Sequence, residues 1–133
     1  MGKMGKKTVE AMVREYGCHP GDIIGAVGPS ICQECYEVSQ DVADAFAEAF
    51  ESRFHRELFY RKENGKYQQE GKYQLNLWRA NELIMEEAGL SREHIHVTDL
   101  CTCCNPELLY SHRASKGKRG NLAAFLGIRR PEA

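Results

Sequence analysis

Apolar side chains recur every three or four residues in three segments of this chain, the spacing that places them on one face of an α-helix. These segments cover residues 7–16, 40–50 and 77–88. Gly17 and Gly89 follow the first and third segments, where glycine commonly ends a helix. Ser39 and Asn76 precede the second and third segments, where short polar side chains commonly cap one. The pattern predicts three amphipathic helices.

Short apolar runs bounded by turn residues predict strands over residues 22–27 and 122–128, and alternation of apolar and polar residues predicts a half-buried strand over 94–98. Residues 57–72 are polar with interleaved aromatic side chains, and Asn64-Gly65 supplies the positive φ angles of a two-residue turn. We therefore expect a hairpin or a long exposed loop there. Because helices and strands alternate, the sequence predicts an α+β fold, a mixed β-sheet flanked by helices.

Length and composition are those of an ordinary globular domain. The chain has 133 residues, 42% of them hydrophobic and 28% charged, so one compact unit over residues 1–133 is expected. No apolar run approaches the ~18 residues of a membrane span, and no secretory leader is recognisable, so we expect a cytoplasmic protein. A net charge of −1 gives no general attraction to nucleic acid or to an anionic membrane.

The chain has six cysteines, and without a secretory signal they are expected to be reduced or metal-bound. Cys32 and Cys35 are separated by two residues, a spacing that lets two sulfurs share one metal ion. Together with Cys101, Cys103 and Cys104 they are candidate ligands of a tetrahedral zinc, although this second group lacks the spacing of a zinc ribbon. The alternative is that these thiols are small buried hydrophobic residues.

A basic loop near the C-terminus is a candidate anion site. Its guanidinium and ammonium groups could hold a phosphate, and Gly117 and Gly120 leave the backbone free to approach it. The basic residues are Arg113, Lys116, Lys118 and Arg119. An ordinary basic hairpin loop is the alternative.

Serine and histidine side chains offer further candidates. Ser111 could act as a nucleophile, but no pattern places a base beside it, and a lone serine is usually a hydrogen-bonding residue. His112 follows it directly and could contact a substrate. His94 and His96 stand two apart on a predicted strand, so their rings would share one face as ligands or bases, or as solvated side chains.

Three blocks of sequence, in this order, resemble one family. They are GPSICQECYEV at residues 28–38, YQLNLWRANEL at 73–83, and residues 101–128 with the run Tyr110-Ser111-His112-Arg113. The chain resembles the C-terminal half of the laccase-domain proteins, also called polyphenol oxidases, whose chains are roughly twice this length. Members of that family are purine nucleoside phosphorylases with adenosine deaminase activity.

The resemblance implies phosphorolysis of adenosine, inosine, guanosine or methylthioadenosine, and deamination of adenosine by metal-activated water. It also implies a zinc or copper ion held by two histidines and one cysteine in the N-terminal half, none with a counterpart here. This partial laccase-domain unit is therefore expected to be inactive alone. Its partners would be a purine nucleoside, phosphate and a missing N-terminal half, or a second copy of itself through an exposed apolar face.

On this resemblance, the turn at Ser30 and the loop up to Arg113 form walls of the substrate pocket. The candidate substrate and phosphate contacts are Ser30, Ser111, His112, Arg113, Lys118 and Arg119. The family usually has arginine where Ala114 and Asn121 stand, so two anion contacts are missing and weak phosphate binding is expected.

Three other readings remain open. Copper-dependent polyphenol oxidation is the alternative enzyme activity, but multicopper sites need more histidine ligands than five scattered ones offer. The non-catalytic alternative is a small binding or scaffold module with a structural zinc. A decayed or incomplete reading frame would also explain the missing motif and the substituted arginines.

Overall fold

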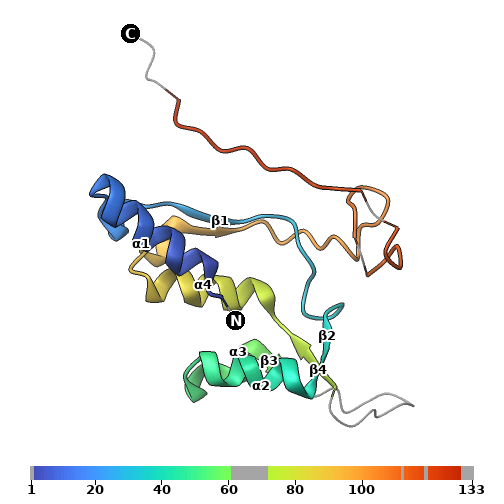
Figure 1. The fold of residues 1–133 in the computed structure, drawn as a ribbon. Helices are drawn as coiled ribbons and strands as arrows, with labels where there is room; N and C mark the ends of the chain where they lie inside the picture. The colour runs from blue at the N-terminus through green and yellow to red at the C-terminus, as the bar shows by residue number, and fades with distance from the viewer. Residues whose placement is uncertain (1, 61–71, 112, 119, 130–133) are drawn as a thin grey trace.

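The computed structural model describes residues 2–60, 72–111, 113–118 and 120–129, and Figure 1 shows their arrangement. The longer helices are α1 (Met4–Tyr16), α2 (Gln40–Ala49) and α4 (Leu77–Glu87), and α3 (His55–Leu58) is a single turn. The strands are β1 (Gly25–Val27), β2 (Glu37–Ser39), β3 (Phe59–Tyr60), β4 (Lys72–Leu75) and β5 (Ile95–Val97). Short 3₁₀ turns cover Pro20–Asp22, Ser52–Phe54 and Arg92–His94.

The described strands form two small sheets. β1 and β5 pair in parallel, with Gly25 opposite Ile95, and β2, β4 and β3 form an antiparallel sheet in that order. The predicted α+β class is therefore confirmed, with both parallel and antiparallel pairing. β3 and β4 flank the predicted hairpin, whose Asn64-Gly65 turn lies outside the described residues.

The predicted helices are present, and most of their ends follow the sequence signals. Gly17 has a φ of 67°, and its N–H donates to the Val13 carbonyl at 3.0 Å. Asn76 caps α4 by accepting a hydrogen bond from the Arg79 N–H at 3.0 Å. Ser39 precedes α2 as predicted, but its hydroxyl donates to the Asp41 carboxylate and does not cap the backbone. That acidic side chain lies in the first turn of α2 and competes for the hydroxyl.

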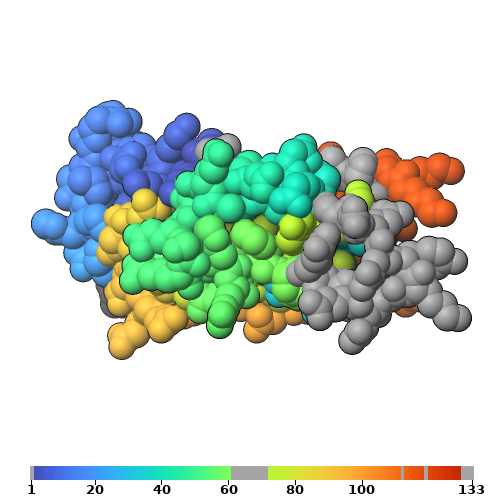
Figure 2. All heavy atoms as spheres, turned by 90° about the horizontal axis from the view of Figure 1, so that it is seen from below, coloured from blue at the N-terminus to red at the C-terminus, as the bar shows by residue number. Residues whose placement is uncertain are grey.

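Helix α4 contributes to both described parts of the core. On one side Leu83 and Ile84 pack with Phe50, Leu58 and Ala80. A second cluster joins Val9 of α1 to Ile23 and Leu90, with Met85 and Ala88 of the α4 region against it. Figure 2 shows the blue α1 region at one end, the orange-red segment after β5 at the other, and the green α2 and α3 region between them.

Two predicted strands differ from the structure. The strand predicted over 22–27 begins only at Gly25, because Pro20–Asp22 form a 3₁₀ turn in which the Ile23 N–H donates to the Pro20 carbonyl. The strand predicted over 122–128 is wrong for the described chain. That segment extends away from the two sheets, as Figure 1 shows, and pairs with no described strand. A strand forms only where neighbouring backbone groups complete its hydrogen bonds.

The segment over residues 121–129, the C-terminal tail, carries large exposed apolar side chains. Phe125 is 95% exposed, Leu126 91% and Ile128 100%. None of the helices among the described residues is long and apolar enough to cross a membrane.

Candidate metal centre

The parallel pairing of β1 and β5 continues beyond the two strands and brings two distant loops together. The Thr98 N–H donates to the Val27 carbonyl at 3.1 Å, and the Ser30 N–H donates to the Leu100 carbonyl at 3.1 Å. Ser30 and Cys101 then form a parallel bridge, in which the Ser30 carbonyl accepts from the Thr102 N–H. The backbone ladder therefore places the loop that begins after Ser30 beside the loop that begins at Cys101.

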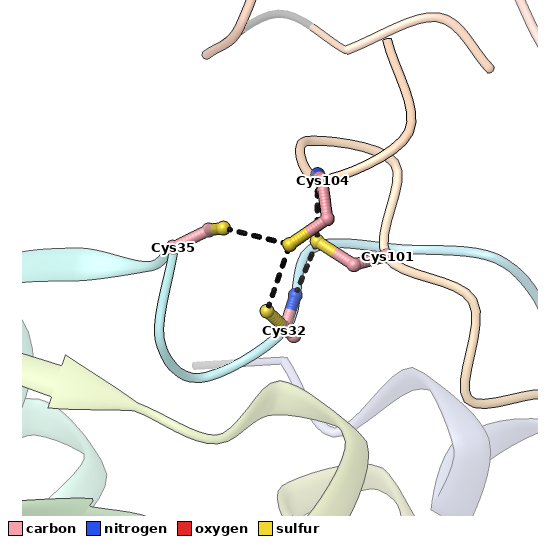
Figure 3. A group of neighbouring side chains, drawn as sticks. All are labelled: Cys32, Cys35, Cys101 and Cys104. Atoms are coloured by element: carbon pink, nitrogen blue, oxygen red, sulfur yellow. Dashed lines mark hydrogen bonds between the residues drawn. The ribbon is translucent and has the colours of Figure 1, made fainter. Parts of the chain in front are cut away.

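Four cysteines converge where these loops meet. The sulfur atoms of Cys32, Cys35, Cys101 and Cys104 all lie within 4.8 Å of one another. Cys104 Sγ is 3.3 Å from Cys35 Sγ and 3.8 Å from Cys32 Sγ. Figure 3 shows two sulfurs pointing inward from the loop before β2 and two from the loop after β5.

Cys103 does not belong to this group, which changes the interpretation of the sequence. The two cysteines of the second loop that do belong to it are Cys101 and Cys104, which are separated by two residues, as Cys32 and Cys35 are. The conclusion that the second group lacks ribbon-like spacing is therefore wrong, because the intervening Cys103 hides a repeated Cys-x-x-Cys pattern. The other four candidate ligands lie together in the structure.

Cys101 and Cys35 differ in how readily their thiols ionise. Burial disfavours a charge on Cys101, but the N–H groups of Cys32 and Cys104 donate to its sulfur at 3.2 and 3.3 Å and lower its pKa to about 6. Burial, then contact with the neighbouring thiols, raises the pKa of Cys35 far above the ordinary value. Cys101 therefore ionises more readily than Cys35.

The residues of the predicted anion site are spread over a turn and its flanks. Ser111 is buried, and its hydroxyl oxygen accepts from the Ala114 N–H at 3.2 Å, so the hydroxyl supports the turn. Arg113 donates to the Glu37 carbonyl at 3.1 Å and lies over the Tyr36 ring at 5.4 Å. Lys118 is exposed, while His112 and Arg119 lie outside the described residues.

Ser30 has a partner that the sequence did not indicate. Its hydroxyl accepts a hydrogen bond from Trp78 Nε1 at 2.7 Å and donates to the Gly28 carbonyl at 3.2 Å. Trp78 falls off the apolar face of the predicted α4 helix, and that position is the signal that it packs against something else. The contact ties α4 to the turn that leads into the cysteine cluster.

His94 and His96 do not form the predicted pair on one strand. His94 closes the 3₁₀ turn Arg92–His94, and only His96 lies in β5, where it is exposed. The turn alters the two-residue periodicity on which the prediction depended.

Comparison with known sequences gives a family. A sequence model described as multi-copper polyphenol oxidoreductase laccase matches residues 1–129. The chain belongs to this laccase family. The match covers all three blocks on which the resemblance was founded.

Named relatives of this laccase-domain chain are purine nucleoside phosphorylases. YlmD of Bacillus subtilis is 35% identical over 96% of this chain and 43% of its own length. The purine nucleoside phosphorylase of Deinococcus radiodurans is 35% identical over 99% of the chain and 46% of its own length. Adenosine deaminase RL5, from an unknown prokaryotic organism, is 31% identical over 98% of the chain. The chain therefore spans less than half the length of these relatives.

Solved structures agree with the laccase-domain fold. The crystal structure of YlmD from Geobacillus stearothermophilus aligns with a TM-score of 0.74 at 30% identity, over 90% of this chain and 42% of that one. The Bacillus licheniformis protein YfiH aligns with a TM-score of 0.76 at 30% identity, over 87% of this chain and 41% of that one.

The donor set in this laccase-domain chain can be compared with the metal site that the resemblance implies. That site has two histidines and one cysteine, whereas the one group of potential ligands found among the described residues consists of cysteines alone. Four sulfur donors suit a soft, tetrahedral ion and do not match a histidine-rich copper centre. The cysteine cluster is therefore a group of potential ligands different from the implied catalytic site.

Proposed function

We propose that this chain is the C-terminal part of a purine nucleoside phosphorylase. The observation that carries the proposal is 35% identity to the Bacillus subtilis phosphorylase along 96% of the chain. The fold alone would not support it, since one fold hosts many activities. Adenosine deamination is the companion activity, supported by the similarity to adenosine deaminase RL5.

The proposed reaction transfers ribose from a purine to phosphate. A phosphate oxygen bonds to the anomeric carbon, the bond from that carbon to the purine nitrogen breaks, and the nitrogen keeps the electron pair and takes a proton. The products are ribose 1-phosphate and the free base. In our proposal Ser30, Arg113 and Lys118 line the pocket together with His112 and Arg119, while Ser111 holds the turn.

A zinc or copper ion in the intact enzyme would supply activated water for the deamination. The described residues of this chain do not provide the implied histidine ligands, so we assign them binding and support only. With Ala114 and Asn121 in place of arginines, weak phosphate binding stays a prediction. The free cysteines suit a reducing compartment and support a cytoplasmic location as part of the proposal.

The test is phosphate-dependent release of hypoxanthine from inosine. We expect no turnover by this chain alone, and turnover when it is mixed with the N-terminal half of the Bacillus subtilis relative. Omitting phosphate should abolish the release, which separates phosphorolysis from hydrolysis. Full-length YlmD serves as the positive control. If the mixture stays inactive while YlmD and its own recombined halves turn over, the proposed function is wrong, and a structural or decayed remnant replaces it.

The same proposal includes a protein partner for the C-terminal tail. Exposed Phe125, Leu126 and Ile128 form an apolar edge that a soluble monomer rarely presents, and the relatives contain more than half of their length outside the match. We expect the tail to pair with the N-terminal half. Light scattering of an equimolar mixture should give the mass of a one-to-one complex, and Phe125→Ser should weaken it. Two separate monomers, or a homodimer unaffected by the added half, would contradict this expectation.

A further inference from the structure

We propose that Cys32, Cys35, Cys101 and Cys104 bind one zinc ion through four thiolates. The site is structural: it joins the loop after β1 to the loop after β5. It is separate from the histidine-containing metal site that the resemblance implies, and it does not depend on the proposed phosphorolysis. It rests on the distances between the sulfurs, the repeated spacing of the cysteines and the hydrogen bonds to one sulfur.

The sulfur positions suit a tetrahedral zinc ion. Zinc–sulfur bonds of about 2.3 Å at tetrahedral angles place the sulfurs about 3.8 Å apart. The separations of 3.3 Å from Cys104 to Cys35 and 3.8 Å from Cys104 to Cys32 lie near this value, and all four sulfurs lie within 4.8 Å of one another. A disulfide would need about 2.05 Å. The four sulfurs are therefore close enough together to share one ion, and none of the four cysteines is joined in a disulfide.

Backbone hydrogen bonds prepare the cluster for thiolates. The Cys104 N–H donates to the sulfur of Cys101, three residues earlier, so the turn between the two ligands already has the compact form in which both sulfurs point the same way. The Cys32 N–H donates to the same sulfur across the two loops. Donors held against a sulfur favour its charged form and orient it toward a metal. Ordinary buried thiols would not require two such donors.

The β1 and β5 ladder explains how residues so distant in sequence form one site. Ser30 and Cys101 are bridged, and both Cys-x-x-Cys turns begin within two residues of that bridge. Four protein ligands close the coordination sphere of zinc and leave no position for a substrate. Zinc and iron both accept four thiolates; we assign zinc because closed sites between loops are its structural type.

The test is metal analysis of the purified chain together with single substitutions. We expect about one zinc ion per chain, since structural zinc sites bind tightly. Each of four single substitutions removes one proposed ligand: Cys32→Ser, Cys35→Ser, Cys101→Ser and Cys104→Ser. Changing a residue that only hydrogen-bonds to a ligand typically lowers metal affinity by a factor of about 10 to 100. Each of these four substitutions should lower zinc affinity by more than that. Cys103→Ser is the matched control, since it removes a thiol between two ligands, and it should keep the full zinc content.

Two measurements on the unmodified chain test the proposal even if a cysteine variant fails to fold. An organomercurial that binds thiolates should release one zinc ion as the four ligand thiols react, and Cys18 and Cys103 account for the two other thiols of the chain. Cobalt substituted for zinc should give the visible bands of tetrahedral coordination and the ultraviolet band of sulfur-to-cobalt charge transfer. Metal-free protein, disulfides detected by mass, one iron or copper per chain, or zinc loss in Cys103→Ser would each overturn the proposal. Failure of the phosphorylase assay leaves these readouts unchanged, so the two proposals fail independently.

Discussion

Leu58→Ala is expected to lower the free energy of unfolding by about 2 to 5 kcal/mol, the range for removing a buried leucine from a packed core. Leu58 is fully buried and packs with Phe50, Ala80, Leu83 and Ile84. It joins the short α3 helix to the inner face of α4, and its carbonyl also accepts from the Asn76 N–H that precedes α4. Truncation leaves a cavity that these elements can close only by shifting together.

Urea unfolding followed by circular dichroism measures this effect. Leu108→Ala is the matched control, because Leu108 is 73% exposed, and its change should stay within about 0.5 kcal/mol. Equal losses in the two variants would mean that Leu58 is not part of a close-packed core.

Gly89→Ala is expected to cost about 2 to 4 kcal/mol, from backbone strain and steric overlap together. Gly89 has a φ of 110°, a conformation that residues with a side chain rarely adopt. A Cβ atom added there would lie 2.8 Å from Cβ of Pro20, whose rigid ring cannot turn aside. The change would therefore strain the end of α4 and push it from the 3₁₀ turn that precedes β1.

The matched control lies in that same turn. Gly21 has no heavy atom within 4 Å of an added Cβ and does not have a positive φ. Thermal unfolding should therefore show a large fall in Tm for Gly89→Ala and little change for Gly21→Ala. A small effect at both positions would show that α4 can end without the left-handed residue.

Local signals predicted most of the helical structure. Gly17 ends α1 in the left-handed conformation, and Asn76 caps α4, because each of these effects depends on a few neighbouring residues. Ser39 marks the start of α2 correctly, but its hydroxyl donates to Asp41. Several acceptors lie near this hydroxyl, and the sequence pattern does not indicate which of them it will bond. These errors and successes all concern interactions within one turn.

Features that depend on distant partners were harder to predict. Residues 122–128 have the composition of a strand, but composition does not supply the neighbouring strand. The repeated two-residue spacing favours Cys104 over Cys103, but the meeting of the two cysteine pairs depends on the Ser30–Cys101 bridge, which fixes the register of the two loops. The family was recognisable earlier than the cluster, because recognition needs matching blocks in order, whereas the cluster needs three-dimensional placement.

Trp78 gives this chain an optical probe of its own. It is the single tryptophan, and its indole N–H is bonded to the hydroxyl of Ser30, two residues before Cys32. Indole emission shifts with the polarity and hydrogen bonding of its surroundings, so loosening of the cysteine loops should change its fluorescence without any attached dye. Loading and stripping of the cluster can therefore be followed in real time in the unmodified protein.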